Sequence, residues 1–310
     1  GETRELLASA GRPDPEGCCI SLLNELAELP GTVLLVLDNY HQITKPEIHR
    51  ALTFLVEHSP PALRLVILSR TDPPLLLERW RAQGSLSEIR ARDLRFTPLE
   101  SAGFMNSIMG LDLDRDGLTI LQERTEGWPA GLYLAALSLK HSSDQESFIQ
   151  DFSGTNLYIG EYLAKEILAN LPDHLEDFLI KTSLLERLTG TLCDALTGRA
   201  NGRETLAELA RQNLFINPLD DHQQWYNLHP LFADLLRERL RTGFPEEIKD
   251  LHRRAALWLA EHGHPLEAIQ QAAQGEDFPY LKSLLQQEDE LTGEAATRHK
   301  NLSLQGRKFL

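Results

Sequence analysis

Residues 33–43 read VLLVLDNYHQI, and residues 63–75 read LRLVILSRTDPPL. In both segments a short run dominated by apolar residues ends at polar ones, which is typical of a strand covered on both faces in a parallel sheet. Residues 46–57 between them are predicted to form a helix, since Pro46 suits a first turn. This strand–helix–strand order predicts half of a three-layer α/β sheet, with a shorter strand at 88–94.

Helical periodicity replaces the strands after about Thr97. A β-hairpin is predicted around the turn-forming residues 220–222, because short apolar and aromatic segments at 214–216 and 225–226 flank them. A helix on each side of the hairpin gives the outline of a winged helix. Two further helices, joined at Gly263, indicate the beginning of a helical repeat. The helices predicted after Thr97 cover residues 98–109, 116–126, 130–140, 156–170, 172–184, 204–212, 230–240, 245–261 and 264–274.

The chain is acidic. Its 310 residues include 31 Lys+Arg and 46 Asp+Glu, a formal charge of −15, which argues against coating nucleic acid or an anionic membrane. No apolar run reaches the roughly 18 residues of a membrane-spanning helix. Cys18, Cys19 and Cys193 cannot form a disulfide framework or a zinc motif. These features predict a reduced, cytoplasmic protein with no membrane partner.

Two polar residues follow the predicted strands. Asp38 comes directly after Leu37, and Arg70 follows the second apolar run. Ligands of open α/β sheets bind beyond the carboxyl ends of the strands, where a carboxylate can hold Mg²⁺ and an arginine can contact phosphate. If the strands are parallel neighbours, both residues share one edge of the sheet. The alternatives are that Asp38 and Asn39 form a simple turn and that Arg70 is a surface residue.

Two later segments also carry candidate residues. His229 precedes Pro230 at the start of a predicted helix, and an imidazole near a helix N-terminus can meet a phosphate. Residues 127–131, GWPAG, open a very apolar helix. From their chemistry alone, Pro129 is an ordinary first-turn proline and Trp128 a core residue.

Several catalytic motifs are missing from these 310 residues. They contain no G-x-x-x-x-G-K-[ST] phosphate loop, no G-x-S-x-G elbow, no H-E-x-x-H and no glycine-rich dinucleotide loop. Hydrolase and dehydrogenase chemistry therefore has no support in the sequence.

The order of the segments carries a family resemblance. LDNYHQI (37–43) resembles a Walker B segment, and LVILSRTDPPL (65–75) resembles the following sensor strand with its arginine. The chain resembles the large ATP-binding regulators of the LuxR class, the MalT-like transcriptional activators, which are STAND signal-transducing NTPases. The resemblance runs from Leu22 to Phe278. Its later parts are a helical region in RFTPLE (95–100) and TEGWPAGLYLAALSL (125–139), a winged helix in FLIKTSLLERLTGTLCDALTG (178–198) and LARQNLFINPLDDHQQWYNLHPLFADLLRERL (209–240), and repeat helices in LHRRAALWLAEHGHPLEAIQQAAQGEDF (251–278).

The resemblance implies a switch controlled by ATP and ADP. In the family, ADP holds the resting state, inducer sensed by C-terminal repeats allows exchange to ATP and self-association, and a C-terminal helix-turn-helix binds DNA. Carried over, Asp38 would be the Walker B acid near Mg²⁺, and Arg70 the sensor that contacts the γ-phosphate. Pro129 would pack near the adenine, and His229 would reach the β-phosphate of ADP.

We therefore predict a mainly α fold with an α/β portion, built from a partial P-loop-type parallel sheet, a helical bundle, a winged helix and the start of a repeat array. Its expected parts are the C-terminal part of a nucleotide-binding α/β domain (1–97), a helical domain (98–185), a winged-helix domain (186–242), the first helices of a TPR-like repeat region (243–285) and an irregular tail (286–310).

Departures from the family shape the functional expectation. Asn39 stands where the family usually has a second acid, which weakens any claim of hydrolysis; the full-length protein would be a weak ATPase. The phosphate loop should precede Leu22, so we expect a middle piece of a longer regulator that binds ATP poorly by itself. The alternative is a non-catalytic interaction module without a nucleotide site. DNA binding by the winged helix itself is disfavoured, since its candidate recognition helix carries Glu204 and Glu208 against Arg211.

Overall fold

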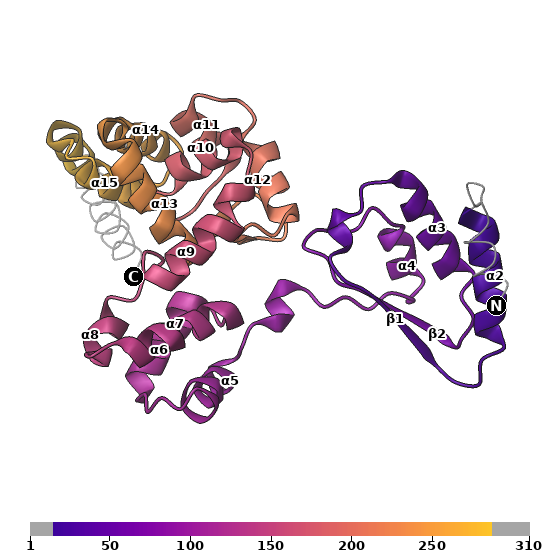
Figure 1. The fold of residues 1–310 in the computed structure, drawn as a ribbon. Helices are drawn as coiled ribbons and strands as arrows, with labels where there is room; N and C mark the ends of the chain where they lie inside the picture. Colours follow the sequence, from indigo (N-terminus) through magenta and orange to yellow (C-terminus); the bar gives the residue numbers. More distant parts are fainter. Residues whose placement is uncertain (1–14, 287–310) are drawn as a thin grey trace, which may run out of the picture. The chain divides into compact units, whose positions relative to one another are not determined.

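A computed structural model describes residues 15–286 of the chain (Figure 1). These residues form two compact units. The first comprises 15–91 together with 211–213, and the second comprises 92–210 and 214–286. The tail predicted at 286–310 lies outside the described residues after its first residue. The prediction of a mainly α fold with an α/β portion is confirmed.

The first unit contains the predicted parallel strand pair. β1 (Val33–Leu37) and β2 (Leu63–Ile67) pair in register from Val33↔Leu63 to Leu37↔Ile67. Side chains alternate between the two faces of a strand, so the odd-numbered residues of both strands share one face. That face packs against α2 (Pro15–Ala27) and α3 (Pro46–Glu57), in a core that contains Leu23, Tyr40, Leu52, Leu55 and Leu63.

The opposite face of this sheet is exposed, which corrects the expectation of cover on both sides. Leu34 and Val36 are 61% and 50% exposed, and Val66 is 42% exposed. Within the described residues the sheet has two strands. The prediction of a strand at 88–94 is also wrong. Residues 91–94 form a short 3-10 helix, and just before it the side chain of Arg90 donates a hydrogen bond to Glu88.

The second unit begins with a helical domain. Thr97 caps α5 (Pro98–Ala102) in a capping box with Glu100, which explains why a helix starts there. The single helix predicted at 98–109 continues from Gly103 to Ile108 as a π-helix. The remaining helices of this part are α6 (Arg115–Thr125), α7 (Pro129–His141), α8 (Gln145–Gln150) and α9 (Leu157–Glu166).

The hairpin and helices of the predicted winged helix follow. β3 (Ile216–Pro218) pairs antiparallel with β4 (Tyr226–Leu228), and an isolated bridge joins Leu188 to Tyr226. Asp220 sets the hairpin turn, since its carboxylate accepts hydrogen bonds from the backbone amides of His222, Gln224 and Trp225. The helices of this part are α10 (Asp173–Thr182), α11 (Gly190–Thr197), α12 (Gly202–Arg211) and α13 (Pro230–Gly243).

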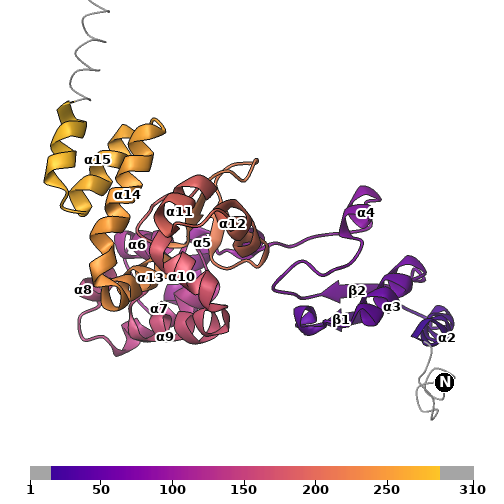
Figure 2. The ribbon, with the colours of Figure 1, turned by 90° about the horizontal axis from the view of Figure 1, so that it is seen from above.

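The predicted helix pair follows the winged helix, and residues 278–286 are helical beyond it. α14 (Ile248–Glu261) and α15 (Pro265–Gln274) lie side by side next to α13 (Figure 2). One hydrophobic cluster runs through the helical domain, the winged helix and this pair, so the second unit has a single core. The first unit also contains the short helix α4 (Leu77–Ala82). No helix in residues 15–286 is long and apolar enough to cross a membrane.

Candidate functional site

The carboxyl ends of β1 and β2 meet at one edge of the first unit. The prediction that the two strands are parallel neighbours is confirmed. Just beyond the strands, the Leu68 amide donates to the Leu37 carbonyl over 2.8 Å, and the Tyr40 amide donates to the Leu68 carbonyl over 3.0 Å. The backbone amide of Arg70 donates to Nδ1 of His41, 3.3 Å away. Residues that follow the two strands are therefore held against each other at this edge.

The Asp38 side chain is exposed at that edge. Its Oδ1 accepts a hydrogen bond from the Asn39 amide over 2.7 Å, and Asn39 has a left-handed backbone with φ of 55°. The turn that the sequence suggested for this pair is thus present. An exposed carboxylate in such a turn still fits a magnesium ion, because Mg²⁺ keeps several waters and usually takes one or two carboxylates plus substrate phosphates.

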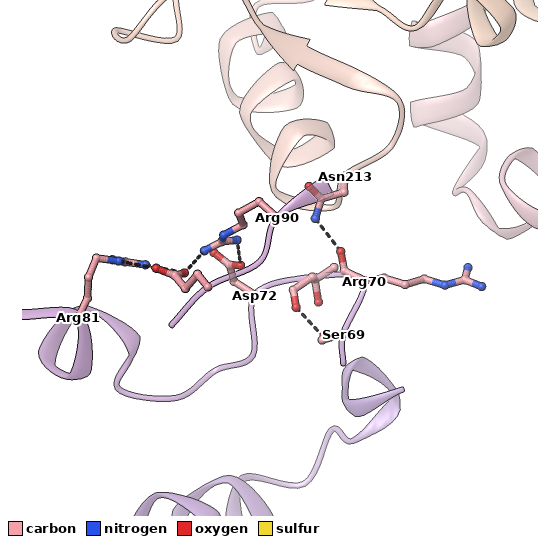
Figure 3. A network of polar contacts seen from close by, with 8 residues as sticks. Ser69, Arg70, Asp72, Arg81, Arg90 and Asn213 are labelled. Atoms are coloured by element: carbon pink, nitrogen blue, oxygen red, sulfur yellow. Dashed lines mark hydrogen bonds and ion pairs between the residues drawn. The ribbon is translucent and has the colours of Figure 1, made fainter. Parts of the chain in front are cut away.

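The loop after β2 is held in place by charged side chains (Figure 3). Arg90 forms ion pairs with Asp72 and Glu88. Arg81 donates to the same Glu88 from Nε over 2.8 Å, and this contact lowers the pKa of Glu88 to about 2. In Figure 3 the Arg70 side chain extends away from this network, while its carbonyl accepts from Nδ2 of Asn213 over 2.7 Å. Arg70 thus projects from a loop with a fixed backbone.

In the second unit, His229 lies near Trp128, the residue that precedes Pro129. Pro129 opens α7, and the ring of the preceding Trp128 lies 6.0 Å from the His229 ring and 5.0 Å from the Phe215 ring, between centroids. His229 stands at the N-cap position of α13, makes no capping hydrogen bond with its side chain, and is 3% exposed. The prediction that Trp128 packs in the core is confirmed, since it packs against the main hydrophobic cluster.

The hydrogen bond of His229 shows which ring nitrogen carries a hydrogen. Its Nε2 lies 2.9 Å from the Thr125 carbonyl, and a carbonyl can only accept, so Nε2 carries the hydrogen. Nδ1 is then a buried acceptor without a hydrogen-bond partner among the described residues. Burial lowers the pKa of His229, against the smaller opposing effect of the Thr125 hydrogen bond. The imidazole is therefore neutral near pH 7.

Contacts with distant residues hold the turn between α6 and α7, which precedes Trp128 and Pro129. Gly127 has φ of +72°, and its carbonyl accepts from the Phe96 amide over 2.7 Å. Arg95 reaches Oε2 of Glu126 over 2.9 Å and also donates to Oδ1 of Asn217 on β3 over 3.2 Å. Such contacts leave no local signal in the sequence, because Arg95 lies 122 positions from Asn217.

A second set of polar contacts joins the helical domain to the winged helix. Arg124 on α6 forms an ion pair with Asp234 on α13, and its Nε donates to the Phe152 carbonyl over 3.1 Å. Asp234 also accepts from the Gly154 amide over 3.2 Å. This arginine and aspartate therefore fix α6, α13 and the segment before α9 to one another.

The four predicted site residues thus form two groups, with Asp38 and Arg70 in the first unit and Pro129 and His229 in the second. In residues 15–286 no three His, Cys, Asp or Glu side chains gather into a metal cluster. Asp38 by itself fits the magnesium prediction only if phosphate oxygens and water complete the coordination.

Comparison with known proteins defines the class. The family "MalT winged helix domain" matches residues 164–248. The HTH-type transcriptional regulator MalT of Yersinia enterocolitica is 36% identical over 269 residues, which cover 86% of this chain and 30% of that protein. MalT of Klebsiella pneumoniae is 35% identical over 267 residues, covering 85% of this chain and 30% of the relative. The serine/threonine-protein kinase PknK of Mycobacterium tuberculosis is 35% identical over 269 residues, 87% of this chain and 24% of the relative.

The fold and these matches define a winged-helix protein of the MalT type that also contains a small parallel α/β unit. The chain is MalT-like over most of its length, and residues 164–248 form its MalT winged helix domain. The predicted winged helix is confirmed. The chain spans about a quarter to a third of the length of the relatives that it matches.

Proposed function

We propose that this chain is the regulatory nucleotide-switch region of an ATP-dependent, LuxR-class regulator of the STAND type. The observation that carries the proposal is the shared edge of β1 and β2, where the residues after both strands are joined by hydrogen bonds. Open α/β sheets bind their ligands outside the carboxyl ends of the strands. In this proposal, Asp38 holds the Mg²⁺ that accompanies the nucleotide, and Arg70 contacts the γ-phosphate.

Bound nucleotide would supply negative charge that this chain's residues can sense. Arg70 is suited to that task, because a guanidinium always carries its charge and makes paired hydrogen bonds to phosphate oxygens. In the second unit, Pro129 packs near the base and His229 responds to the β-phosphate of ADP. Phosphate oxygens accept hydrogen bonds, so His229 must either take up a proton at Nδ1 or release the Thr125 carbonyl before it can donate to one.

The relatives support a regulatory role for this segment. It is similar to part of a protein named as a kinase and to part of proteins named as transcriptional regulators. A kinase and a transcriptional regulator act in different ways. A segment that both kinds of protein share is therefore better suited to regulating their activity than to carrying it out. We further propose that ATP promotes self-association, that a helical repeat region senses inducer, and that DNA binding belongs to a separate C-terminal domain of a cytoplasmic regulator.

Nucleotide titration of the 310-residue chain tests the first part of this proposal. The chain contains no phosphate loop, whose backbone amides and lysine supply most phosphate contacts. We expect negligible heat from ATP–Mg²⁺ and from ADP in isothermal titration calorimetry. Tight binding by this chain would contradict the dependence on a phosphate loop.

The alternative is a non-catalytic interaction module without a nucleotide site. The coding sequence upstream of Gly1 separates the two. A G-x-x-x-x-G-K-[ST] motif some tens of residues earlier supports the nucleotide switch, whereas an independent start codon with no such motif supports the interaction module.

A further inference from the structure

A cleft opens in the second unit where α13, α14 and α15 converge with the loop that follows α10. Its volume is about 340 Å³. Ligand pockets typically measure about 300–1,000 Å³, so this cleft has room for a small organic molecule. The residues that line it are Leu184, Glu186, Arg237, Leu240, Arg241, Ile248, His252, Gln270, Gln271 and Gln274.

The charge of the cleft is opposite to that of the chain. Arg237 and Arg241 stand one helical turn apart on α13, and Glu186 is the single acid among the lining residues. With His252 neutral the lining carries a net charge of +1, in a chain whose formal charge is −15. Arg237 is held in place, because its Nε donates to the Ser183 carbonyl over 2.8 Å. Arg237 also pairs with Asp234 over 3.6 Å and Arg241 with Glu238 over 3.2 Å, so the cleft favours an anion that competes with these two acids for the guanidinium groups.

The base of the cleft is polar and buried. His252 and Gln271 are 8% and 5% exposed, and Nδ1 of His252 lies 2.8 Å from Oε1 of Gln271. Since the amide oxygen can only accept, Nδ1 carries the hydrogen and Nε2 is an acceptor. Burial lowers the pKa of His252, so the ring is neutral near pH 7. The base of the cleft therefore offers hydrogen-bonding groups that carry no charge.

The walls of the cleft add an apolar surface and a fixed shape. Leu184, Leu240 and Ile248 supply the apolar part of the lining. A Cβ on Gly275 would lie 2.7 Å from the His252 Cβ, so the glycine allows the end of α15 to approach α14 closely. This close packing holds the buried base in position before any ligand arrives.

From this arrangement we propose that the cleft binds a small organic anion with one carboxylate or phosphate group and an apolar body. The two guanidinium groups on α13 pair with the anionic group, the apolar side chains cover the body, and His252 and the three glutamines satisfy polar substituents. Such a ligand contacts α13 of the winged helix together with α14 and α15, so its binding stabilises the junction between them. The site is independent of the nucleotide residues proposed above.

Titration of the intact chain in ¹H–¹⁵N NMR spectra tests the site with three matched probes. Benzoate carries a carboxylate, phenyl phosphate carries a phosphate, and benzyl alcohol shares the ring without a charge. We expect at least one of the two anions to shift the side-chain amide signals of Gln270, Gln271 and Gln274 with saturation, and benzyl alcohol to leave them unchanged. The anion that binds more tightly identifies the preferred head group.

Two arginine variants locate the anion. Arg241→Gln and Arg237→Gln should each weaken binding about tenfold, since a charge-assisted pair is lost. Arg241 is exposed and its ion pair is with Glu238 on its own helix, so its replacement leaves the fold intact. Arg253→Gln on α14 removes the same charge outside the cleft and should leave affinity unchanged. No saturable shift with either anion, equal binding of benzyl alcohol, or equal effects of all three variants would overturn the proposal.

Discussion

The Gly154→Ala variant should fail to pack its helical domain on its winged helix. A Cβ at this position would lie 1.6 Å from the Leu231 carbonyl oxygen and 2.5 Å from the carbonyl carbon. Both atoms belong to the backbone of α13, and the Leu231 side chain is fully buried. The helix therefore cannot shift away from residue 154 without disturbing the core. The shift needed would also break the bond from the Gly154 amide to Asp234. We expect the free energy of unfolding to fall by more than about 3 kcal/mol, at or above the usual range for an overpacked core.

Urea denaturation followed by circular dichroism measures this loss. Gly243→Ala is the matched control, because an added Cβ there meets nothing within 4 Å. It should change the free energy of unfolding by less than about 1 kcal/mol. Similar unfolding midpoints for the two variants would show that the Gly154 contact with α13 is not part of the fold.

The Gly127→Ala variant should release the turn that carries Trp128 and Pro129. A Cβ there would lie 2.2 Å from the Phe96 carbonyl oxygen, and Gly127 has a φ of +72°, which an alanine rarely adopts. Overpacking costs about 1–3 kcal/mol and left-handed backbone strain about 1–2 kcal/mol, so a total loss of about 2–5 kcal/mol is expected. The hydrogen bond from the Phe96 amide to Gly127 should be lost with it.

A second glycine separates the two causes. Gly110 also has a positive φ, +68°, but a Cβ there meets nothing within 4 Å. Gly110→Ala should therefore show only the backbone strain, about 1–2 kcal/mol. Thermal melts of both variants give the comparison. If the two substitutions cost the same, the contact between residues 96 and 127 makes no contribution of its own.

The sequence predicted most of what depends on local patterns. The apolar runs at 33–37 and 63–68 predicted two buried strands, and their parallel pairing and shared edge are present. The long helices and the hairpin at Asp220 also follow from periodicity and turn chemistry, which act over a few residues. Short helices such as α4, α8 and α11 escaped prediction, because six to eight residues give too few turns to show a period.

Features that depend on distant residues could not be predicted. The apolar run of β1 indicates cover on both faces, but one face is exposed in the described residues, since cover depends on which elements are present to pack there. His229 was singled out for its place at a helix start. Its actual partner is the Thr125 carbonyl, 104 positions away. The ion pair of Arg124 with Asp234 spans 110 positions and likewise leaves no local signal.

We propose that Arg70 and His229 sense different nucleotides. This proposal is tested most directly by measuring ATP and ADP affinities for a natural polypeptide in which this chain follows its own phosphate loop, with Arg70→Gln and His229→Gln compared. Losing a charge-assisted contact costs about 1.5–3 kcal/mol, or about tenfold or more in affinity. We expect Arg70→Gln to weaken ATP binding at least tenfold and to leave ADP binding nearly unchanged, whereas His229→Gln should weaken ADP binding and spare ATP. Variants that affect both nucleotides equally, or neither, would contradict it.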